Sequence, residues 1–391
     1  MPSALPLAAT AAAAAAPAAA AATASASLSA TLVSVASQAA VSMAINAAMS
    51  VLSPKVGAAG RPVDWTLDPN GPIPFALGRV GVAGSAISKA TFGPDKMNYG
   101  AVSVISGAGP IDGYESYTAD DLLVTFDQNG KCVTPEWNGE LFRVQSLGNQ
   151  PDTWLRTPIG LKNNSVLPNW TASHRASGKA LSFHVMVENS KGTAFPNGEI
   201  KPRIVLRGVK CWDPRKDSTY PGGNGPQRLN SPSTWAWSEN PAILALRWIM
   251  GMWEDGVGKG APHVGQQVGG IGSKLSGIDM PAYVAAANVC DTNGWTAAAY
   301  PNTDDDKHQV LVGLLQAAGA IYSQRAGKIS LIQRASPKTS VATITANDVI
   351  GAIEIDTAAS RIDRINTIQP QFWSPQHRWQ MTALPEVTAQ A

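Results

Sequence analysis

The sequence predicts an α+β fold that is mainly β, with several β-rich domains, a small helical insert and an uncharged N-terminal helix. Glycine and proline number 36 and 28 among 391 residues, which favours many short strands joined by turns. Charged residues make up only 15%, against about 25% in ordinary soluble chains, which favours broad contact surfaces. Near Ser238 the apolar period changes from two residues to a helical spacing.

Composition excludes several kinds of function. The formal net charge of +2 indicates neither a nucleic-acid surface nor a basic membrane patch. Cys132, Cys211 and Cys290 form no CxxC pair, so we expect neither a disulfide framework nor a zinc site. They are expected to be small buried thiols of a protein made in a reducing cytoplasm.

The N-terminal segment, residues 1–54, has no ionisable side chain. Residues 1–27 are low-complexity alanine without the basic region of a signal peptide. Residues 28–52 contain neither proline nor glycine, and as a helix could cross a hydrocarbon layer of about 30 Å. The favoured interpretation is a small-residue helix that self-associates within an oligomer or docks on a neighbouring subunit, because serine and asparagine make it weakly hydrophobic. The alternative is a membrane or lumen helix marked by Leu28, Leu32, Val35, Met43 and Leu52.

Two β-rich domains are expected next, over residues 55–123 and 124–232. Two strands are expected within residues 72–93, followed by Ala101–Ile105 and by two strands after the turn "GAGPIDG". A hairpin is expected through Asn129 and Gly130. Further strands are expected with Phe183, Val185 and Val187 on one face and over Arg203–Val209. The glycine-rich stretches "GRVGVAG" and "GGIGSKLSG" lack the spacing of a phosphate-binding loop. We therefore expect no nucleotide site.

An α/β domain with three helices and a hairpin is expected over residues 233–357, followed by a returning strand in 358–391. The first helix is expected to be capped by Ser238, to hold Pro241 in its first turn, and to continue at helical spacing through Trp253. Asp279 is expected to cap the second helix, whose apolar positions are Tyr283, Ala286, Ala287 and Cys290. The third is expected to open at Thr303 with Asp306 in a capping box, and the hairpin to turn at Ala326 and Gly327.

Signals of catalysis are weak. The five histidines have no metal-ligand spacing, and no GxSxG motif occurs. The aspartates at 304–306 are better explained as acids at a helix start than as a cation site. An acidic pair of the glycosidase type could draw on Glu115, Asp120, Asp121, Glu136 and Glu140, although loop solvation explains these residues better. We expect no catalytic residue, no metal and no cofactor.

Several stretches in collinear order, over about residues 72–385, carry a family resemblance. They include "PIPFALGRVGVAG", "YGAVSVISGAGPIDGYESYTAD", "VLRGVKCWDPRKDST", "PSTWAWSENPAILALRWIMG", "SGIDMPAYVAAANVCDTNG" and "SRIDRINTIQPQFWSP". Together they resemble the motifs of the central tail-tip (hub) proteins of bacteriophages with long non-contractile tails, the host-specificity or tip-attachment family, also found in gene transfer agents.

The resemblance implies a structural virion protein, a homotrimeric hub that adapts a threefold tip to a sixfold tail tube and gates DNA ejection. The implied partners are the tube and distal tail proteins, the C-terminal end of the tape-measure protein, and DNA in transit. Family members continue for hundreds of residues past the last motif. Their ring domain and host-binding part are therefore expected on a separate receptor-binding chain or beyond Ala391. Contact with the host membrane through residues 28–52 is a further expectation.

The resemblance also suggests a role for a tryptophan-rich corner between a strand and a helix. Large aromatics there are expected to fix the angle between two domains through buried area, and Arg215 to pair with a carboxylate or with backbone carbonyls. The residues of this corner are Trp212, Asp213, Pro214, Arg215, Trp235, Trp237, Asn240, Pro241, Trp248 and Trp253.

Three alternatives stay open. The tryptophans could form an exposed carbohydrate-binding patch. The chain could be a tail-associated peptidoglycan hydrolase that uses an acidic pair, or a membrane-active ejection component that acts through residues 28–52.

Overall fold

The computed structural model describes part of the chain. The described residues are 67–149, 161, 166–168, 170–171, 173–174, 177–189, 192–253, 265–335, 340, 342–351, 365–377 and 379–388. The chain separates into two units, Met1–Pro54 and Lys55–Ala391, and all described residues belong to the second. The expected N-terminal helix with Leu28, Leu32, Val35, Met43 and Leu52 therefore lies outside them. Within the described ranges, no helix is long and apolar enough to cross a membrane.

The first sheet is antiparallel, in the order β1-β8-β4-β5. Its strands are β1 (Arg79–Val82), β4 (Ile111–Ala119), β5 (Leu122–Val124) and β8 (Pro202–Val209). Val80 and Val82 alternate with Arg79 and Gly81, so the two valines point into the core while the other two positions lie on the opposite face. Residues from both expected β-rich domains thus share one sheet; the division of the second unit into domains stays a prediction.

The second sheet is also antiparallel, in the order β2-β3-β7-β6. Its strands are β2 (Ser85–Phe92), β3 (Asn98–Ser106), β6 (Leu141–Ser146) and β7 (Ala180–Val187). Phe183 and Val185 pack in a separate apolar cluster, with Val187 against it, which confirms the predicted face of this strand. Met186 points the other way, into the main core.

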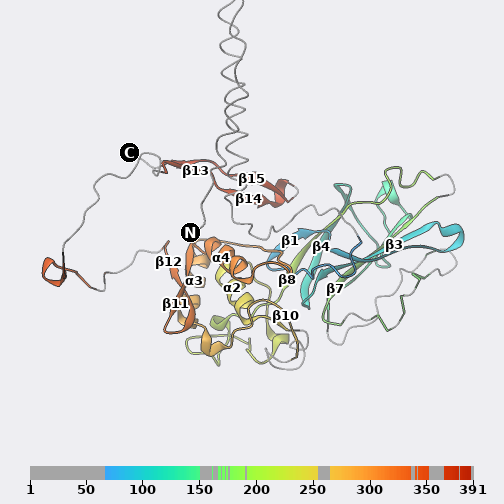
Figure 1. Ribbon diagram of the computed structural model, residues 1–391. Coiled ribbons are helices and arrows are strands. Elements are labelled where there is room, and N and C mark those ends of the chain that lie inside the picture. The colour runs from blue at the N-terminus through green and yellow to red at the C-terminus, as the bar shows by residue number, and fades with distance from the viewer. Residues whose placement is uncertain are drawn as a thin grey trace, which may run out of the picture. The chain divides into compact units, whose positions relative to one another are not determined.

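The helices and a hairpin lie together in the structure (Figure 1). The helices are α2 (Pro241–Met250), α3 (Met280–Thr292) and α4 (Lys307–Ala317). The hairpin is β11 (Ala320–Arg325) and β12 (Lys328–Gln333), and it turns at Ala326 and Gly327 as predicted, both at positive φ. The fold is mainly β with three helices in the described part of the chain, which confirms the predicted fold class.

Two predicted features of the first helix are wrong. Asn240 is the N-cap of α2, and its Oδ1 accepts hydrogen bonds from the backbone N–H groups of Ala242 and Ile243. Ser238 instead accepts a bond from the N–H of Asn240. Trp253 does not continue the helix, because Gly251 ends it at φ 89° and Trp253 belongs to β9 (Met252–Trp253), which pairs with β10 (Gln267–Gly269).

The starts of the other two helices agree with the prediction only in part. Asp279 is the N-cap residue of α3 as predicted, but its carboxylate makes no cap bond and accepts a bond from Ser330 Oγ. The third helix begins at Lys307 rather than Thr303, and Asp306 itself caps it through the N–H groups of His308 and Gln309.

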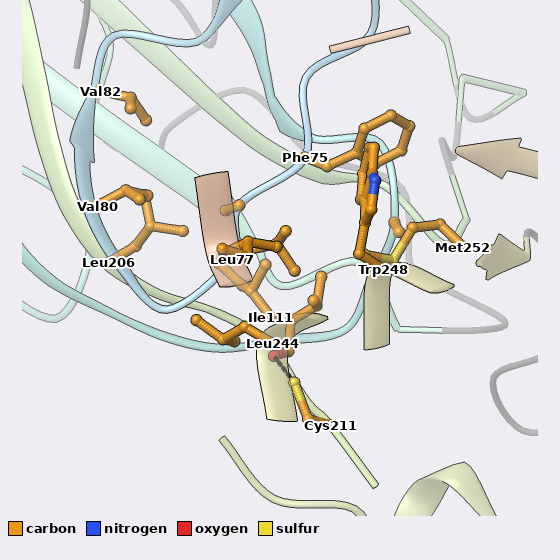
Figure 2. Close-up of a cluster of buried hydrophobic side chains, with 14 of the residues drawn as sticks. Phe75, Leu77, Val80, Val82, Ile111, Leu206, Cys211, Leu244, Trp248 and Met252 are labelled. Atoms are coloured by element: carbon orange, nitrogen blue, oxygen red, sulfur yellow. Dashed lines mark hydrogen bonds between the residues drawn. The ribbon is translucent and has the colours of Figure 1, made fainter. Parts of the chain in front are cut away.

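One apolar core joins the first sheet to the helices. It contains Leu77 and Ile111 from the sheet side and Leu244 and Trp248 from α2. Figure 2 shows part of this cluster, with Phe75 facing Trp248; their ring centroids lie 6.3 Å apart in an edge-to-face arrangement. Three of the predicted corner residues, Trp212, Trp235 and Trp248, belong to this core.

The end of the described chain is a two-stranded ribbon rather than a single returning strand. Its inner pair is β14 (Gln371–Ser374) with β15 (Gln380–Ala383), and its outer pair is β13 (Thr367–Ile368) with β16 (Val387–Thr388). Short 3₁₀ turns complete the fold: η1 (Pro94–Lys96), η2 (Pro135–Trp137), η4 (Pro214–Lys216), η5 (Pro232–Thr234), η6 (Leu275–Gly277), η7 (Ala346–Asp348) and η9 (Pro375–His377).

Candidate functional site

The predicted corner begins where β8 leaves the first sheet. Cys211 and Ala236 exchange backbone hydrogen bonds, with N···O distances of 2.8 and 3.3 Å. This bridge places Trp212 and Asp213 beside Trp235 and Trp237, just ahead of the start of α2. Residues separated by more than twenty positions thereby form one corner.

Asp213, Pro214 and Arg215 form the predicted turn. Pro214 occupies the first position of η4, and Asp213 caps it by accepting the N–H of Arg215 at 3.0 Å. The same carboxylate accepts two bonds from the Arg215 guanidinium, at 2.9 Å from Nε and 2.7 Å from Nη2. This two-bond pairing holds the arginine side chain in one orientation.

Arg215 connects this turn to α3. Its Nη1 donates to Asp291 Oδ2 at 2.7 Å and to Asn288 Oδ1 at 2.9 Å. Burial alone would lower the pKa of the Arg215 guanidinium, but Asp213 and Asp291 outweigh burial and raise it above its ordinary value. The cation is thus permanently charged between two carboxylates.

Asn240 extends the connection to α2. Its Nδ2 donates to Asp291 Oδ1 at 2.7 Å and to the carbonyl of Ala287 at 2.9 Å, while its Oδ1 caps α2. A continuous path of hydrogen bonds therefore runs from Asp213 through Arg215, Asp291 and Asn240. We call these four residues the corner network.

Trp212 is fully packed behind the turn. Its Nε1 donates to Asp217 Oδ2 at 2.9 Å, and its ring meets Tyr220 edge to face. Asp217 also accepts bonds from the backbone and hydroxyl of Thr219 and from the N–H of Leu229. Burial alone would raise the pKa of Asp217, but these hydrogen bonds hold it below its ordinary value.

Trp235 contacts the loop between the turn and α2. Its Nε1 donates to the carbonyl of Arg228 at 2.9 Å, and the Arg247 guanidinium lies 5.3 Å from its ring centroid. Arg247 is a buried residue of α2 that donates to the carbonyl of Gly251, and burial lowers its pKa. The indole therefore contacts a cation that water scarcely reaches.

Trp237 connects the corner to the first sheet. Its Nε1 donates to the carbonyl of Gly78 at 3.2 Å, next to the start of β1. Arg207 of β8 lies 5.7 Å from the ring centroid. Trp237 is half-buried.

The remaining two tryptophans serve other contacts. Trp248 is buried in α2, and its Nε1 donates to the carbonyl of Lys307 at the start of α4. Trp253, in β9, donates to the carbonyl of Met250, the last residue of α2. The structure thus brings Trp212, Trp235 and Trp237 together with the corner network, while Trp248 and Trp253 lie along and beyond the helix.

Sequence reasoning missed the partners of the corner. Asp291 and Asn288 come from the stretch "AAANVCD", for which the sequence predicted a helix face and a family resemblance but no contact with Arg215. The contacts of Asp217, four residues after Asp213, and of Gly78 with the corner were not predicted either. A usable signal existed at Asn240, which directly precedes a proline at a helix start and is among the best N-cap residues.

The arrangement is suited to holding shape rather than to proton transfer. Four of the five acids considered for a catalytic pair contact structural partners: Glu115 pairs with Arg79 at 2.6 Å and Asp121 with Arg203 at 2.8 Å. Asp120 accepts the N–H of Lys201, and Glu140 accepts a bond from Asn189. Burial raises the pKa of Cys211 to about 12, so its thiol is protonated at neutral pH.

Groups able to hold a metal ion are absent from the residues whose placement is described: no three His, Cys, Asp or Glu side chains converge there. His263 lies outside them. The three cysteines are buried and free, which confirms the prediction for them.

Comparison with protein-family models finds no match, and comparison with curated proteins finds none either. Among solved structures, the chain is similar to a chain of a "Virion of native gene transfer agent (GTA) particle", with 15% sequence identity and a TM-score of 0.45. The similar region covers 90% of this chain and 76% of that one.

Proposed function

We propose that this chain is a structural protein of a phage-like virion, the homotrimeric hub at the distal end of a tail tube. In this role it adapts a threefold tip to a sixfold tube and gates the passage of DNA. It acts through shape and contacts and carries out no catalysis.

The observation that carries the proposal is the corner network. Its residues come from three of the stretches that resemble hub motifs: "VLRGVKCWDPRKDST" supplies Asp213 and Arg215, "PSTWAWSENPAIL" supplies Asn240, and "AAANVCD" supplies Asp291. Their meeting in one hydrogen-bonded corner gives the motifs a shared structural reason. A protein that closes a tube needs a fixed angle between its sheet and its helices, and charge-assisted bonds fix such an angle.

The proposed partners follow from the same role. They are two further copies of this chain, the tube and distal tail proteins, the C-terminal end of the tape-measure protein, and a separate receptor-binding chain. DNA passes only in transit. The chain is made in the host cytoplasm and resides at the tail end of the virion.

The first experiment measures the mass of the full chain in solution together with its effect on cell walls. We expect three times the 40.8 kDa mass of one chain and no clearing of peptidoglycan. A monomer that clears peptidoglycan would establish the hydrolase alternative instead. Electron microscopy of tails carrying a tagged chain then tests its position, which we expect at the end distal to the capsid.

A second experiment tests the corner in assembly. Trp237→Ala removes the half-buried ring and its bond to Gly78, whereas Trp237→Phe keeps most of the ring and removes only the bond. We expect the alanine variant to fold but to yield few complete tails, and the phenylalanine variant to yield more. Normal tail numbers with both variants would contradict a role of this corner in assembly.

The membrane alternative depends on residues 28–52, which lie outside the described structure. A peptide of these residues mixed with liposomes tests it, and a failure to bind lipid would count against it.

A further inference from the structure

Trp379 has an unusual position at the tip of the C-terminal ribbon. It lies between η9 and β15, with φ at 58°, a region that bulky residues rarely adopt. Its side chain is only 8% exposed, although much of the surrounding ribbon is exposed. A disfavoured backbone conformation around a buried indole indicates that something outside the ribbon holds the ring.

That contact is Gly81 of β1. A Cβ added at Gly81 would overlap the Trp379 indole at Cδ1 and Nε1, so the ring lies on the glycine at a separation that any side chain would prevent. Val80 and Val82 point into the core, so the indole covers the opposite, outer face of the first sheet.

Val205 completes the contact surface. It pairs with Gly81 across β1 and β8, and paired residues share a face of the sheet. Val205 is buried at 9% exposure, yet it belongs to neither apolar cluster found in the described residues. A buried valine on the outer face needs a cover, and the indole of Trp379 lies on Gly81, its partner across the two strands.

We propose that Trp379 anchors the C-terminal ribbon, residues 365–388, onto the outer face of the first sheet, with Gly81 and Val205 as its socket. Isolated two-stranded ribbons are marginally stable in water, so this one depends on its anchor for order. The indole of Trp379 thereby fixes the position of the ribbon on the sheet. This contact is independent of the function proposed above.

Hydrogen exchange on the full chain tests the anchor. Trp379→Gly removes the indole, while glycine adopts a φ near 58° without steric strain. We expect amide exchange across residues 371–383 to rise about tenfold or more, because a buried tryptophan is lost, while β3 keeps its protection. Trp373→Ala, on the same ribbon, is the matched control and is expected to have a much smaller effect.

A second variant changes Gly81, the residue that the indole contacts. Gly81→Ala leaves the ribbon sequence intact and places a methyl group where the indole lies, so it is expected to raise exchange in the same residues. Unchanged ribbon protection in both variants would overturn the proposal. Loss of ribbon protection on dilution of the unmodified chain would overturn it as well, since the indole would then come from a second copy.

Discussion

At the scale of single residues, Arg215 is the cation of the corner network and joins its two acids. A guanidinium offers five N–H donors in a fixed plane, and that of Arg215 makes four hydrogen bonds, to Asp213, Asp291 and Asn288, two of them paired on the Asp213 carboxylate. A lysine could place one charge between the two acids but could not reproduce this geometry.

Replacing Arg215 therefore tests the network directly. We expect Arg215→Ala to lower the free energy of unfolding by about 2 to 3 kcal/mol, because Asp213 is left buried without its cation. Arg215→Lys should recover part of this loss. Arg203→Ala breaks a pair whose acid is 43% exposed and should cost less than about 1 kcal/mol. Equal losses in urea titrations of the two alanine variants would contradict the assignment.

The lowered pKa of the buried His184 predicts how the free energy of unfolding depends on pH. It is buried in β7, and burial together with the charge of Lys89 lowers its pKa to about 3. The unfolded chain binds a proton near pH 6.5, whereas the folded chain does not until about pH 3, so stability falls as pH decreases between these values. We expect this residue to contribute a slope of about 1.4 kcal/mol per pH unit in that window.

Urea unfolding of His184→Leu between pH 7 and 4 measures this contribution. The variant should show a shallower loss of stability toward low pH than the unmodified chain. Ser182→Ala changes a buried polar neighbour on the same face of β7 and should leave the slope unchanged. A slope that is the same in all three proteins would show that His184 does not titrate in this way.

At the scale of elements, the start of α2 combines two tasks in one side chain. Asn240 caps the helix with its oxygen and binds Asp291 and the Ala287 carbonyl of α3 with its amide nitrogen. Asp306 performs only the first task for α4. Comparing variants of Asn240 and Asp306 therefore separates the effect of helix capping from the effect of hydrogen bonds between helices.

We expect Asn240→Ala to cost about 2 kcal/mol, the sum of a lost cap and lost bonds to α3, and Asp306→Ala about 1 kcal/mol. Asn240→Asp keeps the cap but sets a second carboxylate against Asp291, so its stability should improve when the pH is lowered. Thermal unfolding of the three variants measures these differences. An Asn240→Ala variant no worse than Asp306→Ala would show that the bonds to α3 add nothing.

The elements themselves could be predicted because apolar spacing reports which face is buried. Phe183 and Val185, and likewise Tyr283 and Cys290, are buried as that spacing predicted. The helix ends could not be predicted equally well, because Ser238 and Asn240 are both good caps and only the tertiary contacts of Asn240 favour one of them. Trp253 matched the helical period, but Gly251 ended the helix before it.

At the scale of the whole molecule, the corner depends on topology that local patterns do not report. Arg215 and Asp291 are 76 positions apart, and Trp237 and Gly78 are 159 apart. The sequence predicted that Arg215 pairs with a carboxylate or with backbone carbonyls, but it could not select Asp291 from the other acids. Similarly, nothing local links Trp379 to Gly81, because both the ribbon and β1 must form before they meet.

The shared core makes one further prediction about the whole molecule. Phe75 has no exposed surface and meets Trp248 of α2, so it lies between the sheet and the helices (Figure 2). Because a single apolar cluster spans both parts, we expect them to unfold together, with tryptophan fluorescence and far-ultraviolet circular dichroism giving one coincident transition.

Phe75→Ala should lower the free energy of unfolding by about 3 to 5 kcal/mol and keep the two probes coincident, because it weakens one common core. Phe372→Ala, at a phenylalanine that is 40% exposed on the ribbon, should change it by less than about 0.5 kcal/mol. If Phe75→Ala instead separated the two transitions, the sheet and the helices would be independent folding units, and the corner network would join two domains rather than brace one.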